Sequence, residues 1–351
     1  MGIRLSVLDQ TLIHDGEDPT VAFGHTVELA RKAEEWGYHR FWVSEHHDSD
    51  RVAGSSPEVL IAHLLAKTER IRVGSGGVML QHYSPYKVAE NFNVLASLNP
   101  GRVDLGIGRA PGGLPHSIRA LQGGKGEQAS LPEKIGELLA YTRDRLPPDH
   151  PFVGLKASPV PRTPADVYLL GASAGSADTA ASLGLPYVYA LFINNDEAEA
   201  ERALQAYRES FRSAEGREPE PLLAVSVIVA DTDEEARGIA EECRIVKIRL
   251  KSGRAITVAN VRHAEEYGRQ AEEEYTIEEK QAYVVHGSKE TVRERLLDAR
   301  RRYGTDEFVV ISPIREAAKR LRSYELLKEA FAAAAEPSAD RASRAKLAAA
   351  P

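Results

Sequence analysis

The stretch FWVSEHHDSD, residues 41–50, sets the pattern from which the fold is predicted. Two aromatic residues and a valine are followed directly by four ionisable residues, 45–48, so an apolar strand stops where charged side chains begin. A helix then opens at Ser56-Pro57, because proline is favoured in the first turn of a helix. A buried strand that ends in polar residues and leads into a helix is the unit of a parallel sheet with crossover helices.

The same unit recurs along the chain. Eight strand–helix steps favour the α/β class and a (β/α)8 TIM barrel. The runs predicted as strands are residues 3–8, 41–43, 71–76, 103–108, 166–171, 186–191, 222–230 and 307–312. Helices are predicted near 20–36, from 56, from 84, near 131–143, over 177–184 and over 321–334.

Two long segments are additional to the strand–helix units of a minimal barrel. Residues 110–160 and 244–285 are predicted insertions after strands 4 and 7, where barrel loops build active sites. The first insertion is expected to contain one helix, at 131–143. Residues 1–335 are expected to form a single domain, and the small, polar tail 336–351 is expected to be disordered.

Composition narrows the function classes. The net charge of −7, from 45 basic and 52 acidic residues, argues against nucleic acid as a partner. Cys243 is the only cysteine and lies in the helix-like stretch EEARGIAEECRIVKIRL, residues 234–250, so no internal disulfide can form. No signal pattern or membrane-spanning run is present, and a cytoplasmic protein is expected.

His46 and His47 are the first candidate functional residues. Successive strand residues point to opposite faces, so both imidazoles cannot enter one barrel mouth, which weakens a metal site. No HExxH or CxxC pattern supports a metal either, and none is predicted. His46 is interpreted as a proton donor or acceptor, with a solvated or structurally hydrogen-bonded histidine as the alternative.

Gly76-Gly77, at the end of the third predicted strand, is the second candidate. Paired glycines permit backbone angles and close approaches that other residues do not. The apolar residues 78–80 follow at once, so a ligand-facing bulge and a plain turn are both open.

A split anion site is the third candidate. Arg109 follows the fourth predicted strand, while Ser173 and Ser176 follow the fifth and open a helix. A guanidinium, two hydroxyls and free N–H groups at a helix start would together bind a phosphate. A simple helix N-cap is the alternative for either serine. Pro111 breaks a GxGxxG fingerprint, and no GxxxxGK[ST] loop occurs.

These segments, taken in order, resemble the bacterial luciferase-like flavin monooxygenases, in particular their uncharacterised single-chain branch. The resemblance covers most of residues 3–330. It is carried by LSVLDQ at 5–10, SEHHD at 44–48, VGSGGVML at 73–80, NPGRVDLGIGRAPGG at 99–113, LLGASAGSADTAASLGLPYVYA at 169–190 and GSKETVRERL at 287–296.

The resemblance implies residue roles. His46 would stand beside the reactive face of the flavin ring and control proton transfer. Gly76-Gly77 would form a cis peptide beneath the ring, and Val78 would contact it. The residues implied at the flavin phosphate are Arg109, Ala172, Ser173 and Ser176. The reactive cysteine of the light-emitting members has no counterpart here, so no thiol role is expected.

The resemblance also implies an activity: monooxygenation of a small organic substrate by O2 and reduced FMN, through oxygen addition at the C4a carbon. A separate flavin reductase would supply the reduced FMN, and the chain would pair as a homodimer through its early helices. A deazaflavin-dependent hydride transfer and a non-catalytic flavin-binding protein are the alternatives. The sequence does not indicate the organic substrate.

Overall fold

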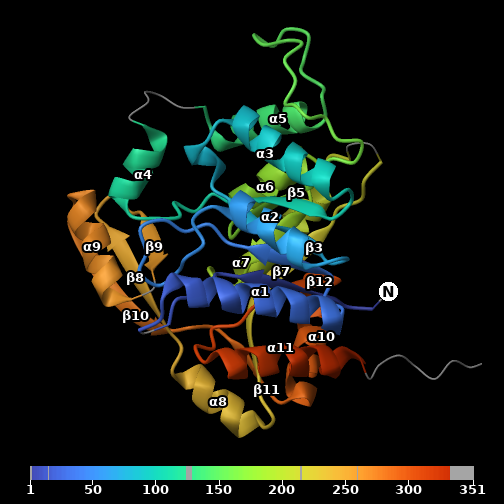
Figure 1. Ribbon diagram of the computed structural model, residues 1–351. Coiled ribbons are helices and arrows are strands. Elements are labelled where there is room, and N and C mark those ends of the chain that lie inside the picture. The colour runs from blue at the N-terminus through green and yellow to red at the C-terminus, as the bar shows by residue number, and fades with distance from the viewer. Residues whose placement is uncertain (1, 15, 124–128, 214–215, 259, 333–351) are drawn as a thin grey trace, which may run out of the picture.

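A closed parallel β-barrel is the centre of the protein (Figure 1). The computed structural model describes residues 1–351 except 1, 15, 124–128, 214–215, 259 and 333–351. Neighbouring strands pair in the order β7-β12-β1-β2-β3-β4-β5-β6, and β6 pairs with β7 to close the barrel. The barrel strands are β1 (Arg4–Asp9), β2 (Arg40–Val43), β3 (Arg72–Val78), β4 (Val103–Ile107), β5 (Asp166–Gly171), β6 (Tyr187–Ala190), β7 (Pro221–Val229) and β12 (Glu307–Ile311). The predicted (β/α)8 TIM barrel is therefore confirmed.

Helices follow the strands and cover the outside of the barrel. They are α1 (Pro19–Trp36), α2 (Pro57–Lys67), α3 (Pro85–Leu98), α6 (Ala174–Ser182), α7 (Glu197–Ser210), α8 (Asp233–Glu241), α10 (Lys289–Tyr303) and α11 (Ala317–Ala332). Proline occupies the first turn of α1, α2 and α3, as the Ser-Pro pairs predicted for two of them. A short strand, β11 (Val285–Gly287), was not predicted and pairs with the far end of β7.

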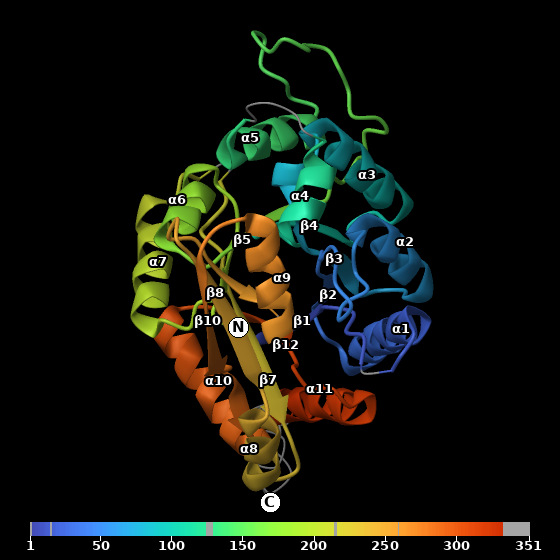
Figure 2. The same cartoon turned by 90° about the vertical axis from the view of Figure 1, so that its left-hand side faces the viewer.

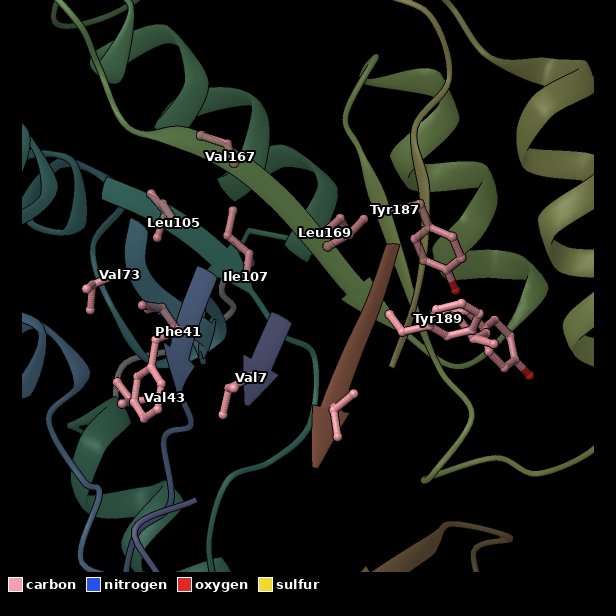
Figure 3. Packing of buried hydrophobic residues seen from close by; sticks show 14 of the residues in the cluster. Val7, Phe41, Val43, Val73, Leu105, Ile107, Val167, Leu169, Tyr187 and Tyr189 are labelled. Atoms are coloured by element: carbon pink, nitrogen blue, oxygen red, sulfur yellow. The ribbon is translucent and has the colours of Figure 1, made fainter. Parts of the chain in front are cut away.

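Strand residues alternate between two cores. Figure 3 shows part of the larger one, in which residues such as Val7, Leu105 and Leu169 face the helices. Leu8, the residue after Val7 on β1, and Trp42 on β2 belong to a smaller cluster inside the barrel. Successive side chains on opposite faces are what β geometry requires, and both faces are buried because helices surround the barrel.

The first insertion contains an unpredicted helix. Besides α5 (Leu131–Thr142), which matches the predicted helix, α4 (Pro115–Gln122) lies near a 3-10 turn, Leu80–His82. None of the residues of α4 is buried. Leu114, Ile118 and Leu121 do follow helical spacing, but the helix is only eight residues long, too short for that pattern to be read as a helix.

The prediction for 234–250 was wrong in part. The helix α8 ends at Glu241, before Cys243, and the next residues form the strand β8 (Arg244–Leu250). The strand pairs antiparallel with β9 (Ala255–Val258) and β10 (Tyr275–Gln281). The small sheet and α9 (Val261–Ala271) make up the second insertion, which comes after α8 rather than directly after strand β7.

The two insertions pack on each other at the carboxyl ends of the barrel strands. Leu114 of the first insertion is buried in the core of the second, among Val246, Ile248 and Tyr267. The His116 N–H also donates to Gln270 Oε1 on α9 (2.9 Å). Figure 2 shows α4, α9 and the small sheet side by side at this end of the barrel.

None of the described helices is both long and apolar enough to cross a bilayer. The tail predicted to be disordered, 336–351, lies outside the described residues.

Candidate functional site

His46 borders a cleft at the carboxyl end of the barrel. The β2 strand ends at Val43, and the half-buried imidazole shares a hydrogen bond at Nδ1 with Ser44 Oγ (3.0 Å). Its backbone N–H donates to Gly54 O (2.8 Å). Burial lowers the pKa of His46 to about 4, against a smaller opposing effect of the Glu45 carboxylate. The ring is therefore neutral at pH 7 and able to accept a proton.

Glu45 is a buried residue that joins two segments of the site, and the sequence analysis did not select it as a candidate functional residue. Its side chain has no solvent exposure, and it accepts hydrogen bonds from His47 Nε2 (2.8 Å), Tyr83 Oη (2.7 Å) and the Met79 N–H (2.9 Å). Burial and the Glu45 carboxylate raise the pKa of the Tyr83 hydroxyl. Glu45 thus ties the end of β2 to the segment after β3. His47 is hydrogen-bonded to Glu45 while His46 borders the cleft, although β2 ends at Val43 and the strand alternation assumed in the prediction does not extend to these residues.

Gly76 and Gly77 form a bulge, one of the two forms left open from the sequence. Ser75 pairs with Leu105 but Val78 pairs with Ile107, so β3 carries one extra residue. The Gly76–Gly77 peptide is cis, which agrees with the resemblance. A Cβ on Gly77 would lie 2.7 Å from Gly106 O, so close packing of β3 against β4 alone requires this glycine.

Val78 is wholly buried in the larger core, so its side chain has no exposed surface for a ligand. Its carbonyl accepts the Gly108 N–H (2.9 Å). If Val78 borders a flavin ring, the contact is through the backbone.

Arg109 and the α6 residues leave neighbouring strands. Ile107 of β4 pairs with Leu169 of β5, so Arg109 comes alongside Gly171, directly before Ala172. The Arg109 side chain is exposed, and among the described residues its guanidinium has no hydrogen bond or ion pair. A cation at this position is available to an anion that approaches the β4 and β5 ends.

Ser173 and Ser176 form a capping box at the start of α6. Ser173 Oγ accepts the Ser176 N–H (3.4 Å), and Ser176 Oγ also meets Tyr187 Oη (2.8 Å). The N-cap alternative is therefore correct for Ser173. An N-cap hydroxyl remains compatible with phosphate binding, because the helix start still presents N–H groups and a positive dipole end.

A carboxylate lies at this helix start. Glu199 Oε1 accepts the Ala174 N–H (3.2 Å), and Glu199 Oε2 accepts from Arg202 Nη2 (2.9 Å). The hydrogen bonds from Arg202 and Ala174 lower the pKa of Glu199, so it is ionised at neutral pH. A phosphate at the start of α6 fits only if Glu199 turns away toward Arg202.

The cleft beside His46 has a volume of about 1150 Å³. Its walls come from the loops after β1 and β2, from α1, and from both insertions. Its lining residues include Phe23, His46, Asp48, Leu114, Arg262, His263, Arg269 and Tyr275. Of the predicted site residues only His46 lines it; the others end β3, β4 and β5 around the same barrel mouth.

Comparison with known proteins gives a consistent result. A family model described as luciferase-like monooxygenase matches residues 3–307. The chain is 45% identical over 337 residues to a protein of Bacillus subtilis named N-acetyl-S-alkylcysteine monooxygenase, covering 95% of this chain and 99% of that one. It is 34% identical to a luciferase-like monooxygenase of Escherichia coli K12 over 92% of this chain and 96% of that one. The solved structure of apo-MsnO8 is 38% identical, with a TM-score of 0.76 over 94% of this chain and 98% of that one.

Proposed function

We propose, because this chain belongs to the luciferase-like monooxygenase family, that it uses reduced FMN and O2 to oxygenate a small organic substrate at the carboxyl end of its barrel. The observation that supports this most is the order of four strand ends. The Gly76–Gly77 bulge lies near the end of β3, and His46, Arg109 and Ser173 follow β2, β4 and β5; these four consecutive strands are neighbours in the barrel. Strands about 4.8 Å apart spread these groups over roughly 14 Å, a span suited to an elongated ring-and-phosphate ligand.

The phosphate would be held at the β4 and β5 ends. Arg109 supplies a free guanidinium, and Ser173 and Ser176 supply hydroxyls at the positive end of α6. Glu199 already has Arg202 as a second partner, so its carboxylate can leave the Ala174 N–H without losing every hydrogen bond.

Reduced flavin, when bound, supplies the electrons that activate O2. The protein's own contribution is proton control and exclusion of water. His46 is neutral at pH 7 and held at Nδ1 by Ser44; in the tautomer whose Nδ1 donates to Ser44 Oγ, Nε2 is free to accept a proton. The packed insertions, joined through Leu114, would cover the reaction.

The His46 role predicts a separation of binding from turnover. A His46→Ala variant is expected to keep the Kd for reduced FMN within about twofold, while turnover falls by about 10²-fold, a usual loss for a proton-transfer group. Anaerobic titration measures the first quantity and product formation the second. Unchanged turnover would remove His46 from the chemistry.

For the substrate, we propose a thioether that carries a carboxylate. The B. subtilis relative named for N-acetyl-S-alkylcysteine covers nearly the whole chain. The cleft beside His46 joins apolar residues, Phe23 and Leu114, with the guanidinium groups of Arg262 and Arg269. The apolar wall suits an S-alkyl group and a guanidinium suits a carboxylate. Arg262 is paired with Asp50 and Arg269 with Glu266, so the substrate carboxylate has to displace one of these partners.

The deciding experiment is an anaerobic titration with reduced FMN and, separately, with a reduced deazaflavin, followed by ¹⁸O2 and N-acetyl-S-alkylcysteine. We expect tighter FMN binding, about tenfold weaker binding in Arg109→Ala, and ¹⁸O in the product. Arg119→Ala, on α4, is the control. Preference for the deazaflavin would favour hydride transfer, and binding without any product from a panel of substrates would favour a flavin-binding protein.

A separate reductase as the source of reduced FMN is also part of the proposal. If it is correct, the purified chain with NAD(P)H and FMN alone forms no product, and addition of a flavin reductase starts the reaction.

A further inference from the structure

We propose that His14, Glu17 and His25 bind one divalent transition-metal ion of the zinc type. His14 and Glu17 lie in the loop between β1 and α1, and His25 lies on α1. One potential ligand atom from each residue lies within 4.8 Å of the others. The three residues are half-buried. None of them lines the cleft or belongs to the proposed flavin site.

The ligand chemistry is that of zinc. Two imidazoles and one carboxylate form a usual three-residue zinc set, with the fourth position left to water. Bonds of about 2.0–2.2 Å place the ligand atoms of one tetrahedral ion roughly 3.4 Å apart. The ligand atoms lie within 4.8 Å of one another, so binding of one ion requires them to move closer by up to roughly 1.4 Å.

One feature of the cluster favours a cation. His25 Nδ1 is buried and has no hydrogen-bond partner among the described residues, and a metal bound at that atom would supply one. Arg315 and Arg320 lie near His14 and oppose a cation.

The positive charge of the arginines near His14 is partly neutralised. Arg320 is paired with the buried carboxylate of Asp9, and Glu17 adds a negative charge inside the cluster itself. Glu17 Oε2 already accepts the His14 N–H (3.3 Å), so the loop is folded toward the cluster before any ion binds.

Metal binding at this cluster would hold one wall of the cleft beside His46 in place. The loop after β1 pairs with the loop after β2: the Ile13 N–H donates to Arg51 O (2.8 Å), and the Ala53 N–H donates to Thr11 O (3.0 Å). The His46 N–H in turn donates to Gly54 O (2.8 Å). An ion that joins the loop to α1 would therefore stabilise the segment on which His46 rests.

The spacing explains why the sequence analysis predicted no metal. The histidines are eleven residues apart, with Glu17 between them, whereas the patterns sought there were HExxH and CxxC. Only the turn from the loop into α1 brings the residues together.

The test uses the untagged full chain, stripped with a chelator and without flavin, so its outcome does not depend on the proposed function. Zn²⁺ titration by calorimetry is expected to give one site per chain. His25→Asn and Glu17→Gln should each weaken Zn²⁺ binding more than tenfold, since loss of a ligand exceeds the usual effect of an outer-shell change. His63→Asn, an exposed histidine of α2, should bind as wild type does.

Circular dichroism of each variant verifies that it is folded. Hydrogen exchange should slow on Zn²⁺ addition at residues 11–14 and 51–54 in wild type and in His63→Asn, and not in His25→Asn. Failure of wild type to bind Zn²⁺, or equal binding by wild type and folded His25→Asn, would overturn the proposal.

Discussion

At the scale of single residues, the charge state of His46 follows from its surroundings rather than from its type. Burial dominates and lowers its pKa to about 4, while in an unfolded chain a histidine has a pKa near 6.5. Between these values the unfolded chain binds more protons than the folded one. The free energy of unfolding therefore falls as the pH drops from about 6.5 to about 4.

A His46→Gln variant lacks the contribution of His46 protonation to the pH dependence of the free energy of unfolding. Its melting temperature should fall less steeply than that of wild type between pH 6.5 and 4, while the two differ little in slope above pH 7. Thermal unfolding across a pH series measures this, with His63→Gln as the control. Parallel curves for wild type and His46→Gln would contradict the assigned burial.

Glu199 gives a second prediction at this scale. Because its carboxylate occupies the Ala174 N–H at the start of α6, it competes with any phosphate there and repels it. Removal of the Glu199 charge near the start of α6 weakens the repulsion of a bound anion. Glu199→Gln should thus tighten reduced FMN binding about two- to fivefold.

The matched control is Glu209→Gln, on the same helix but hydrogen-bonded to Gln205. Its FMN affinity should equal that of wild type. Weaker FMN binding in Glu199→Gln would mean that the carboxylate supports the flavin site instead of competing for it.

Contacts between residues far apart in the chain cannot be predicted from local sequence patterns. Glu45 meets the Met79 N–H across 34 positions and Glu199 meets the Ala174 N–H across 25. His46 was singled out because it follows a short apolar strand, a local signal. The role of Glu45 depends on which loop packs over β2, and no local pattern encodes that.

At the scale of elements, the barrel strands, the positions of the insertions and α5 were predictable, whereas the other elements inside the insertions were not. Strands such as β7 are buried on both faces and read as unbroken apolar runs. In β8, charged residues alternate with Ile245, Val246 and Ile248, and the acidic α8 precedes it directly. The helical pattern was extended into the strand because its β-branched residues were given too little weight.

Because the two insertions pack on each other through Leu114, loss of this contact should cause local rather than global unfolding. Leu114→Ala leaves a cavity among Val246, Ile248 and Tyr267, and such a change costs about 2–5 kcal/mol where the residue is buried. This small core is separate from the barrel cores, so the loss should open the second insertion first.

Hydrogen exchange is the measurement. Residues 244–281 should exchange faster in Leu114→Ala, while β1 and β12 keep wild-type protection. Ile193→Ala, an exposed isoleucine after β6, should change neither region. Equal loss of protection in the barrel strands would show that the insertions are part of the main folding unit.

At the scale of the whole molecule, one side of the barrel carries exposed apolar side chains on early helices. Val59 of α2 is 72% exposed, and Leu98 of α3 is 69% exposed. Val94, four residues before Leu98, lies on the same face of α3. Helices α2 and α3 pack on each other, so we expect these side chains to contribute to one apolar surface, the kind of surface that marks interaction sites.

We therefore expect a homodimer through α2 and α3, and a charge placed there to separate it. A Val59→Glu, Leu98→Glu double variant buries two unpaired carboxylates per chain in the interface, and the desolvation cost should raise the dissociation constant by at least about 10²-fold. Gln205→Glu, on α7 across the barrel (Figure 2), adds a charge away from this surface and should leave the dimer intact. Light scattering should give twice the chain mass for wild type and the control, and one chain mass for the double variant. A monomeric wild type, or a dimer that tolerates both glutamates, would move the interface elsewhere.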